Sequence, residues 1–140
     1  VARAIVSAVR AYDRSLIVFA PAASALALAA LDAGLPVVRE GFADRGYAAD
    51  GALLARGEPG AVAESAAAAA DQALTIVTEH RVRTREGRWL PMEVDTLCVH
   101  GDTPGAAQMA KAVRRRLVDA GVELVKAADV LARSNRAVAD

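Results

Sequence analysis

Three short apolar runs, separated by helix-like sequence, constrain the fold of this chain more than any other feature. They are Leu16–Phe19, Val37–Val38 and Thr96–Val99. Short runs that are apolar throughout are typical of strands buried on both faces of a parallel sheet. Strands that alternate with helices form right-handed crossover units in such a sheet. The sequence therefore predicts an α/β fold with parallel strands and flanking helices.

Helical periodicity marks most of the sequence between these runs. Apolar residues recur at helical spacing from Ala4 to Tyr12, which predicts an opening amphipathic helix. Further helices are predicted over 24–33, 61–79 and 105–120, with Pro104 in the first turn of the third, and weak helical character over 125–135. Residues 81–85 and 89–91 flank Glu86-Gly87-Arg88 and predict a surface hairpin.

The length of 140 residues fits one domain that spans residues 1–140. Alanine supplies much of the apolar content, and it buries little area per residue. Only three core strands are visible, whereas a free-standing doubly wound domain or barrel has more. Val1 stands where a methionine would open a complete chain. We therefore expect this chain to be part of a larger fold.

Charge and cysteine content exclude several classes of partner. Seventeen basic residues balance seventeen acidic ones, so nothing favours nucleic acid or an anionic membrane. The only tight basic run, Arg114–Arg116, fans out around a helix as a solvated face. No apolar run approaches the roughly 20 residues of a membrane span. A single cysteine, Cys98, suits a reducing compartment, so we expect a cytoplasmic protein.

Two short polar loops, Glu40–Tyr47 and His100–Thr103, follow the second and third apolar runs. In parallel α/β folds ligands bind beyond the carboxyl ends of strands. Both loops begin at such an end, so we expect their side chains to meet at one rim of the sheet. The whole stretch 41–60, which contains five glycines, is predicted to be a long irregular loop that is functional or mobile.

The second loop offers one histidine and two oxygen-bearing side chains. His100 suits a general base, a proton donor or a metal ligand, and the alternative is a strand-end histidine bonded to backbone. Asp102 lies two residues after His100 and supports a catalytic role for that histidine. Asp102 or Thr103 is equally suited to cap the helix that follows.

The first loop offers charges of both signs and one aromatic ring. Glu40, Asp44 and Arg45 suit a cluster that binds a carboxylate or phosphate through the guanidinium, or an ordinary loop salt bridge. Tyr47 is placed either to orient a substrate or to anchor the loop.

The remaining chemically interesting residues have structural interpretations. His80 lies at a predicted helix end, where a cation suits the helix dipole. Cys98 lies within an apolar strand as a small core residue, and Trp89 covers the hairpin. The sequence contains no glycine-rich phosphate loop, CxxC pair or HExxH pattern.

The two loops together resemble the LamB/YcsF family. Residues 40–47 read EGFADRGY, followed by Asp50-Gly51, Leu53, Arg56 and 59–62 (PGAV), and residues 95–106 read DTLCVHGDTPGA. The resemblance implies an irregular β/α barrel like that of polysaccharide deacetylases. It also implies that this chain is the C-terminal half, because the family's N-terminal Asp- and His-containing motifs are absent here.

The resemblance further implies a function. Members of the family are the A subunits of the ATP-dependent 5-oxoprolinase, which opens 5-oxoproline to L-glutamate with partner subunits B and C. On this hypothesis ATP is a co-substrate held by a partner, and a divalent metal is a further candidate. His100 and Asp102 are then the expected catalytic residues, and the expected substrate-binding residues are Glu40, Asp44, Arg45, Tyr47 and Thr103.

Two other hypotheses remain open from the sequence. One is a deacetylase-like, metal-dependent amide or carbohydrate hydrolase, which would work without ATP or partner subunits. The other is a non-catalytic module whose loops bind a partner or a small ligand.

Overall fold

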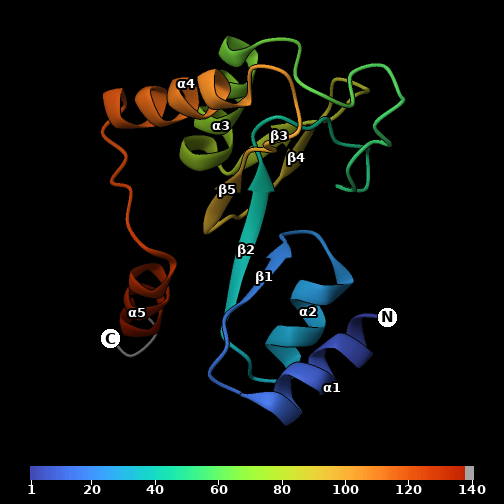
Figure 1. Ribbon diagram of the computed structural model, residues 1–140, viewed down its shortest axis with the longest axis vertical. Helices are drawn as coiled ribbons and strands as arrows, with labels where there is room; N and C mark the ends of the chain where they lie inside the picture. The colour runs from blue at the N-terminus through green and yellow to red at the C-terminus, as the bar shows by residue number, and fades with distance from the viewer. Residues whose placement is uncertain (138–140) are drawn as a thin grey trace.

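A computed structural model of the protein describes residues 1–137 and contains a three-stranded parallel sheet with helices packed against it (Figure 1). The strand order is β1-β2-β5, with β2 in the middle, and β3 and β4 form a separate antiparallel hairpin. In chain order the elements are α1 (Ala2–Tyr12), β1 (Val18–Pro21), α2 (Ala25–Asp32), β2 (Val37–Phe42), α3 (Ala66–Glu79), β3 (Arg81–Arg83), β4 (Trp89–Pro91), β5 (Thr96–Cys98), α4 (Ala106–Asp119) and α5 (Ala127–Ala137).

Helices α1 and α2 pack against the amino-terminal part of the sheet. Val18 and Ala20 of β1 and Val37 of β2 point to the same face, since Val18 pairs with Val37 in parallel register and side chains alternate along a strand. They are buried in one cluster with Val6 and the α2 alanines. Ser24 caps α2, because its hydroxyl accepts a hydrogen bond from the Ala27 N–H at 3.1 Å.

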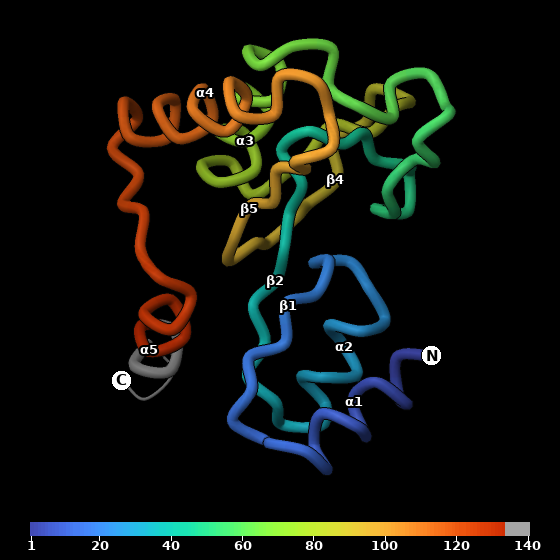
Figure 2. Tube along the Cα trace, viewed as in Figure 1, coloured from blue at the N-terminus to red at the C-terminus, as the bar shows by residue number. Residues whose placement is uncertain are grey.

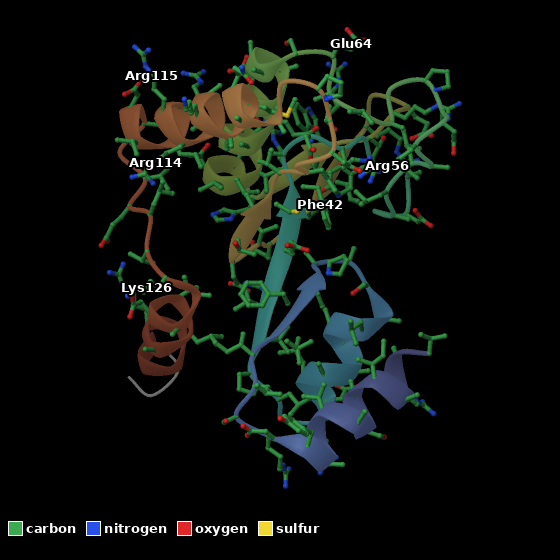
Figure 3. The ribbon with its side chains drawn as sticks, in the orientation of Figure 1. Phe42, Arg56, Glu64, Arg114, Arg115 and Lys126 are labelled. Atoms are coloured by element: carbon green, nitrogen blue, oxygen red, sulfur yellow. The ribbon has the colours of Figure 1, made fainter. Side chains whose placement is uncertain are left out.

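Helices α3 and α4 pack on each other at the other end of β2, where Figure 1 shows them side by side. Ala69 and Ala73 of α3 are fully buried against Met109, Val113 and Leu117 of α4. Small alanine side chains let two helix backbones approach closely, so the alanine-rich sequence of α3 serves this contact. Arg114 and Arg115 are both exposed and project from different sides of α4, so the basic run fans out around the helix as predicted (Figure 3).

The opposite face of the sheet is less well covered. Phe19 of β1 is 50% exposed, and Glu40, Thr96 and Cys98 are only partly buried. The prediction that these runs are buried on both faces is therefore wrong for β1, where burial alternates along the strand. It is also wrong for β5, whose three residues are all partly buried.

Several predicted boundaries differ from the structure; strand β1, for example, spans Val18–Pro21 rather than Leu16–Phe19. Strand β2 continues through Phe42, so Glu40 lies within the strand rather than in a loop. Helix α3 begins at Ala66, not near residue 61, because the Ser65 hydroxyl caps it. Helix α4 begins at Ala106 after Gly105, whose left-handed φ of 82° suits glycine, so Pro104 precedes the helix.

The predicted hairpin is confirmed as β3 and β4, and the predicted first and last helices are confirmed as α1 and α5. Trp89 is half-exposed on the hairpin, and the Arg81 guanidinium stacks over its ring with Cζ 4.1 Å from the centroid. None of the helices in residues 1–137 is long and apolar enough to cross a membrane.

Candidate active site

The two polar loops meet at the carboxyl ends of β2 and β5, as predicted. Figure 2 shows the segment after β5 passing close to the segment after β2. The pairing of these strands continues one step past their ends, because the Ala43 N–H donates to the Cys98 carbonyl at 3.1 Å. This extra step brings Asp44 opposite His100, although 56 positions separate them in the sequence.

Asp44 and His100 form a hydrogen-bonded dyad. The Asp44 carboxylate accepts from the His100 backbone N–H at 2.9 Å, and its two oxygens lie 3.0 and 3.1 Å from His100 Nδ1. A carboxylate only accepts, so Nδ1 carries a proton and Nε2 is left for chemistry. Asp44 is fully buried, whereas the His100 side chain is 23% exposed. The dyad therefore holds one ring edge rigidly and leaves the imidazole within reach of a ligand.

Phe42 and Tyr47 support the histidine. The Phe42 ring stacks on the imidazole with centroids 5.7 Å apart. The Tyr47 hydroxyl accepts the Phe42 N–H at 2.7 Å, which folds the chain after β2 into a tight turn. Burial raises the pKa of Tyr47 to about 12, so the phenol stays neutral. Tyr47 thus anchors the loop, one of the two roles that the sequence suggested.

Gln72 of α3 holds the same turn and was missed from the sequence. Its side-chain amide donates to the carbonyls of Phe42 (2.9 Å), Ala43 (3.1 Å) and Arg45 (2.8 Å). The signal that could have found it was a polar residue beside the buried alanines at 69 and 73 of an otherwise apolar helix face.

Arg45 is bound to the backbone of its own loop. Its Nε donates to the Ala61 carbonyl at 2.9 Å and its Nη2 to the Leu54 carbonyl at 2.6 Å, and the residue is 8% exposed. The loop closes tightly here, since a Cβ on Gly46 would lie 2.1 Å from the Gly60 carbonyl oxygen. Among the ion pairs of residues 1–137, none joins Arg45 to Glu40 or Asp44, so the predicted charge cluster does not form.

Glu40 lines a mainly apolar pocket of about 240 Å³, and neither Asp44 nor His100 is part of its lining. Its walls come from the β1–α2 turn, β2 and the loop around Leu53, and they include Phe42 and Tyr47. Burial raises the pKa of the neighbouring Cys98 thiol, and the charges of Glu40 and Asp44 raise it further. A neutral thiol is a poor nucleophile, which agrees with a structural role for Cys98.

A larger pocket of about 410 Å³ lies away from the dyad, among β5, α4 and α5. Its lining is mostly aliphatic and contains no histidine. Pocket volume therefore does not identify the candidate active site here. The pairing of two titratable groups, Asp44 and His100, is the better indicator.

Asp102 and Thr103 lie on the rim and do not cap α4. Asp102 is 64% exposed and pairs with Arg56 of the loop 43–65 between β2 and α3, with Nη1 2.9 Å from Oδ2 and Nη2 3.3 Å from Oδ1. Helix α4 has no side-chain cap, and the Thr103 carbonyl accepts only the Ala106 N–H, so the predicted capping role is wrong.

Metal-ligating groups do not gather in the part of the chain that the structure describes. No three His, Cys, Asp or Glu side chains in residues 1–137 are placed to hold an ion. His80 ends α3 in a left-handed conformation with its Nδ1 3.5 Å from Glu93, so its ion-pair partner is not a residue of the dyad.

The structure thus combines a parallel α/β sheet with a carboxylate–imidazole dyad at its carboxyl rim, the edge at which α/β folds bind ligands. Residues 1–132 match the LamB/YcsF family, and the chain belongs to that family.

Three relatives are informative. The chain is 50% identical over 121 residues to a 5-oxoprolinase A subunit of Methylococcus capsulatus, covering 86% of this chain and 46% of the relative. It is 48% identical over 124 residues to a 5-oxoprolinase A subunit of Symbiobacterium thermophilum, covering 89% and 48%. The crystal structure of a lactam utilization protein from Thermus thermophilus superposes with a TM-score of 0.80 at 39% identity, covering 88% of this chain and 49% of that one.

The chain thus spans about half the length of the curated relatives that it matches. The predicted family and α/β fold are confirmed. The sheet in residues 1–137 is open, which is consistent with a part of a barrel-like fold.

Proposed function

We propose that this chain supplies the acid–base half of a 5-oxoprolinase A subunit. The reaction opens the lactam ring of 5-oxoproline with water to give L-glutamate, and it is coupled to ATP hydrolysis. The names of the relatives support the substrate class. The single structural observation that carries the proposal is the Asp44–His100 dyad, in which Nδ1 of His100 faces the buried carboxylate.

His100 is the proton-transfer residue in this proposal. Nε2 takes a proton from the attacking water as its oxygen bonds to the ring carbonyl carbon. The carbon–nitrogen bond then breaks, and the same nitrogen of His100 returns the proton to the departing amine. Asp44 fixes the tautomer and stabilises the imidazolium that forms between these steps, as a carboxylate does in other acid–base dyads.

The other predicted site residues have supporting roles. Glu40 faces the 240 Å³ pocket, where its carboxylate suits the ring N–H or the ammonium group of the product. Arg45 and Tyr47 hold the loop that carries Asp44. The Thr103 hydroxyl offers a substrate contact on the rim.

ATP and the partner subunits complete the proposal. An amide carbonyl is a weak electrophile, and phosphorylation of its oxygen by ATP would make the ring carbon more open to attack by water. Loss of the ring amine would then leave an acyl phosphate, which a second water hydrolyses to L-glutamate and phosphate. The sequence has no phosphate-binding loop, so we assign ATP binding to partner subunits B and C. The proton transfers described above use the side chains of this chain alone.

The decisive experiment measures glutamate release from 5-oxoproline with ATP and subunits B and C. The protein to assay joins this chain to the part of the Methylococcus capsulatus relative that it does not match, and we call it the completed protein. His100→Gln should lower kcat by about 10²- to 10⁴-fold, the usual contribution of a general base, and Asp44→Asn by about 10²-fold or more. His80→Gln is the matched control, since it changes the other histidine and should leave turnover unchanged.

Two results would sink the proposal. One is an inactive completed protein when B and C are shown to work with an intact relative. The other is near-normal turnover in both dyad variants. Metal-dependent hydrolysis without ATP would instead establish the deacetylase-like alternative.

A further inference from the structure

The substrate in the proposed function is an anion, and a site for it needs a cation near the dyad. Arg45 is the arginine that the sequence nominated. However, two of its nitrogens bind backbone carbonyls, and the residue is almost fully buried. A guanidinium in that position holds the loop together and has little surface left for a ligand. The recognition of a carboxylate therefore falls to another side chain.

Arg56 is the arginine that contacts the loop His100–Thr103. Its guanidinium extends from the 43–65 loop to Asp102, two residues after His100. The other arginines with ion pairs near this end are engaged elsewhere: Arg85 pairs with Glu58, and Arg116 pairs with Asp71 on the outer side of the helices. Arg39 lies toward the amino end of the sheet and pairs with Asp95.

The geometry of the Arg56–Asp102 pair is that of carboxylate recognition. Two guanidinium nitrogens face two carboxylate oxygens, at 2.9 and 3.3 Å. This fork-to-fork arrangement is the one by which arginine binds carboxylates in general. Asp102 therefore occupies the position that a carboxylate ligand would take.

Exposure makes this pair exchangeable. The Arg56 side chain is 47% exposed and that of Asp102 is 64% exposed. Exposed ion pairs gain little net free energy because water and salt screen them. Neither side chain has another hydrogen bond among residues 1–137 that would be lost in an exchange.

We propose that Arg56 binds the carboxylate of the substrate, and that Asp102 holds the guanidinium in place until the substrate displaces it. This inference rests on the proposed function and identifies its specificity-determining residue. Arg56 selects lactams that carry a carboxylate and sets that group beside His100. Asp102 is a positioning residue that competes with the substrate for Arg56.

The test measures KM and kcat of the completed protein for 5-oxoproline, with ATP and subunits B and C. Arg56→Gln should raise KM roughly tenfold to a hundredfold, as expected for the loss of a charge-assisted pair, with a much smaller change in kcat. Arg56→Lys keeps the charge but loses the two-nitrogen fork, so its KM should lie between that of the unsubstituted protein and that of Arg56→Gln. Asp102→Asn should lower KM, because it removes the competitor.

Arg85→Gln is the matched control. Arg85 has the same 47% exposure and pairs with Glu58 of the same loop, but it does not reach the catalytic loop. Its KM should equal that of the unsubstituted protein. Thermal unfolding of each variant, followed by circular dichroism, checks that the loop and fold survive.

The possible outcomes separate this inference from the proposed function. If the unsubstituted completed protein turns over but Arg56→Gln behaves like Arg85→Gln, the role of Arg56 is wrong and the proposed function stands. If Asp102→Asn raises KM as much as Arg56→Gln, the pair is structural and the exchange is refuted. If the unsubstituted protein releases no glutamate, both proposals fail together.

Discussion

Two arginine–aspartate pairs lie toward opposite ends of the parallel strands, and they differ in burial. Arg39 and Asp95 join β2 to the residue before β5, with side chains 36% and 14% exposed. Arg56 and Asp102 join the loop 43–65 to the loop His100–Thr103 at the carboxyl ends of the strands, with side chains 47% and 64% exposed. The residue types are the same, and both pairs bring two guanidinium nitrogens to two carboxylate oxygens.

The number of bonds at each aspartate separates a structural pair from an exchangeable one. Asp95 accepts from Arg39 Nε and Nη2 at 2.9 Å and also from the Arg39 backbone N–H at 2.8 Å. The Asp95 N–H in turn donates to the Arg39 carbonyl. This pair therefore sets the register of β5 against β2. Within residues 1–137, by contrast, the side chains of Arg56 and Asp102 bind only each other.

The largest expected effect comes from removing Asp95. Asp95→Ala leaves three donors of Arg39 without an acceptor in a partly buried site, so the free energy of unfolding should fall by about 1–3 kcal/mol. Urea unfolding of the completed protein measures it. Asp102→Ala is the matched control at the exposed pair, and an equal loss in both variants would contradict the difference between the two pairs.

Acid should remove the contribution of Asp95. Burial raises the pKa of Asp95, but the hydrogen bonds and charge of Arg39 outweigh burial, so the pKa lies below its ordinary value. A lowered folded-state pKa stabilises the protein above the unfolded value of about 3.9, and the effect is lost as pH falls through the folded value. The difference in unfolding free energy between the unsubstituted protein and Asp95→Ala should thus be full at about pH 6 and shrink below about pH 4. A difference that stays constant down to about pH 2 would show that the charge of Asp95 does not stabilise the fold.

Loss of Gln72 should loosen the turn that carries Asp44 by an intermediate amount. Gln72→Ala frees three backbone carbonyls, one of which belongs to Arg45 next to Asp44. Because these carbonyls become accessible to water, the stability loss should be about 1 kcal/mol. kcat should fall more than KM rises, since His100 loses its fixed orientation. Gln108→Ala is the control, because it removes the exposed glutamine of α4. It should change neither the free energy of unfolding nor the kinetic constants.

The local elements and the shared rim could be predicted from the sequence because they depend on short-range patterns. Apolar runs and helical spacing predicted β1, α1, α2 and the hairpin, and the rule for parallel strands predicted that Asp44 and His100 would lie at the same edge. The individual bonds could not be predicted, because they depend on a register between residues 56 positions apart. One further ladder bond at Ala43 decides whether Asp44 meets His100.

Arg45 shows a second limit of prediction from sequence. A loop arginine beside an aspartate looks like an anion-binding residue, but here the Arg45 guanidinium donates to the carbonyls of Leu54 and Ala61 within the closed loop 43–65. Which arginine satisfies the loop and which faces the rim depends on how the whole loop folds. The sequence around Arg45 and Arg56 therefore does not show that Arg45 is buried against the backbone of its loop while Arg56 is exposed and paired with Asp102.

The smallest expected effect concerns the exposed pair, and it is the sharpest test of the difference between the two pairs. Asp102→Ala should change the free energy of unfolding by less than about 0.5 kcal/mol, as for most surface substitutions. A double-mutant cycle with Arg56→Gln should give a coupling close to zero, while the same cycle for Asp95→Ala and Arg39→Gln should give about 1 kcal/mol or more. Both cycles use urea unfolding of the completed protein at neutral pH and low salt. Near-zero coupling means that a substrate carboxylate can displace Asp102 at almost no cost in stability. Equal coupling in the two pairs would mean that Arg56 is as firmly held as Arg39, and it would then be a poor candidate for binding substrate.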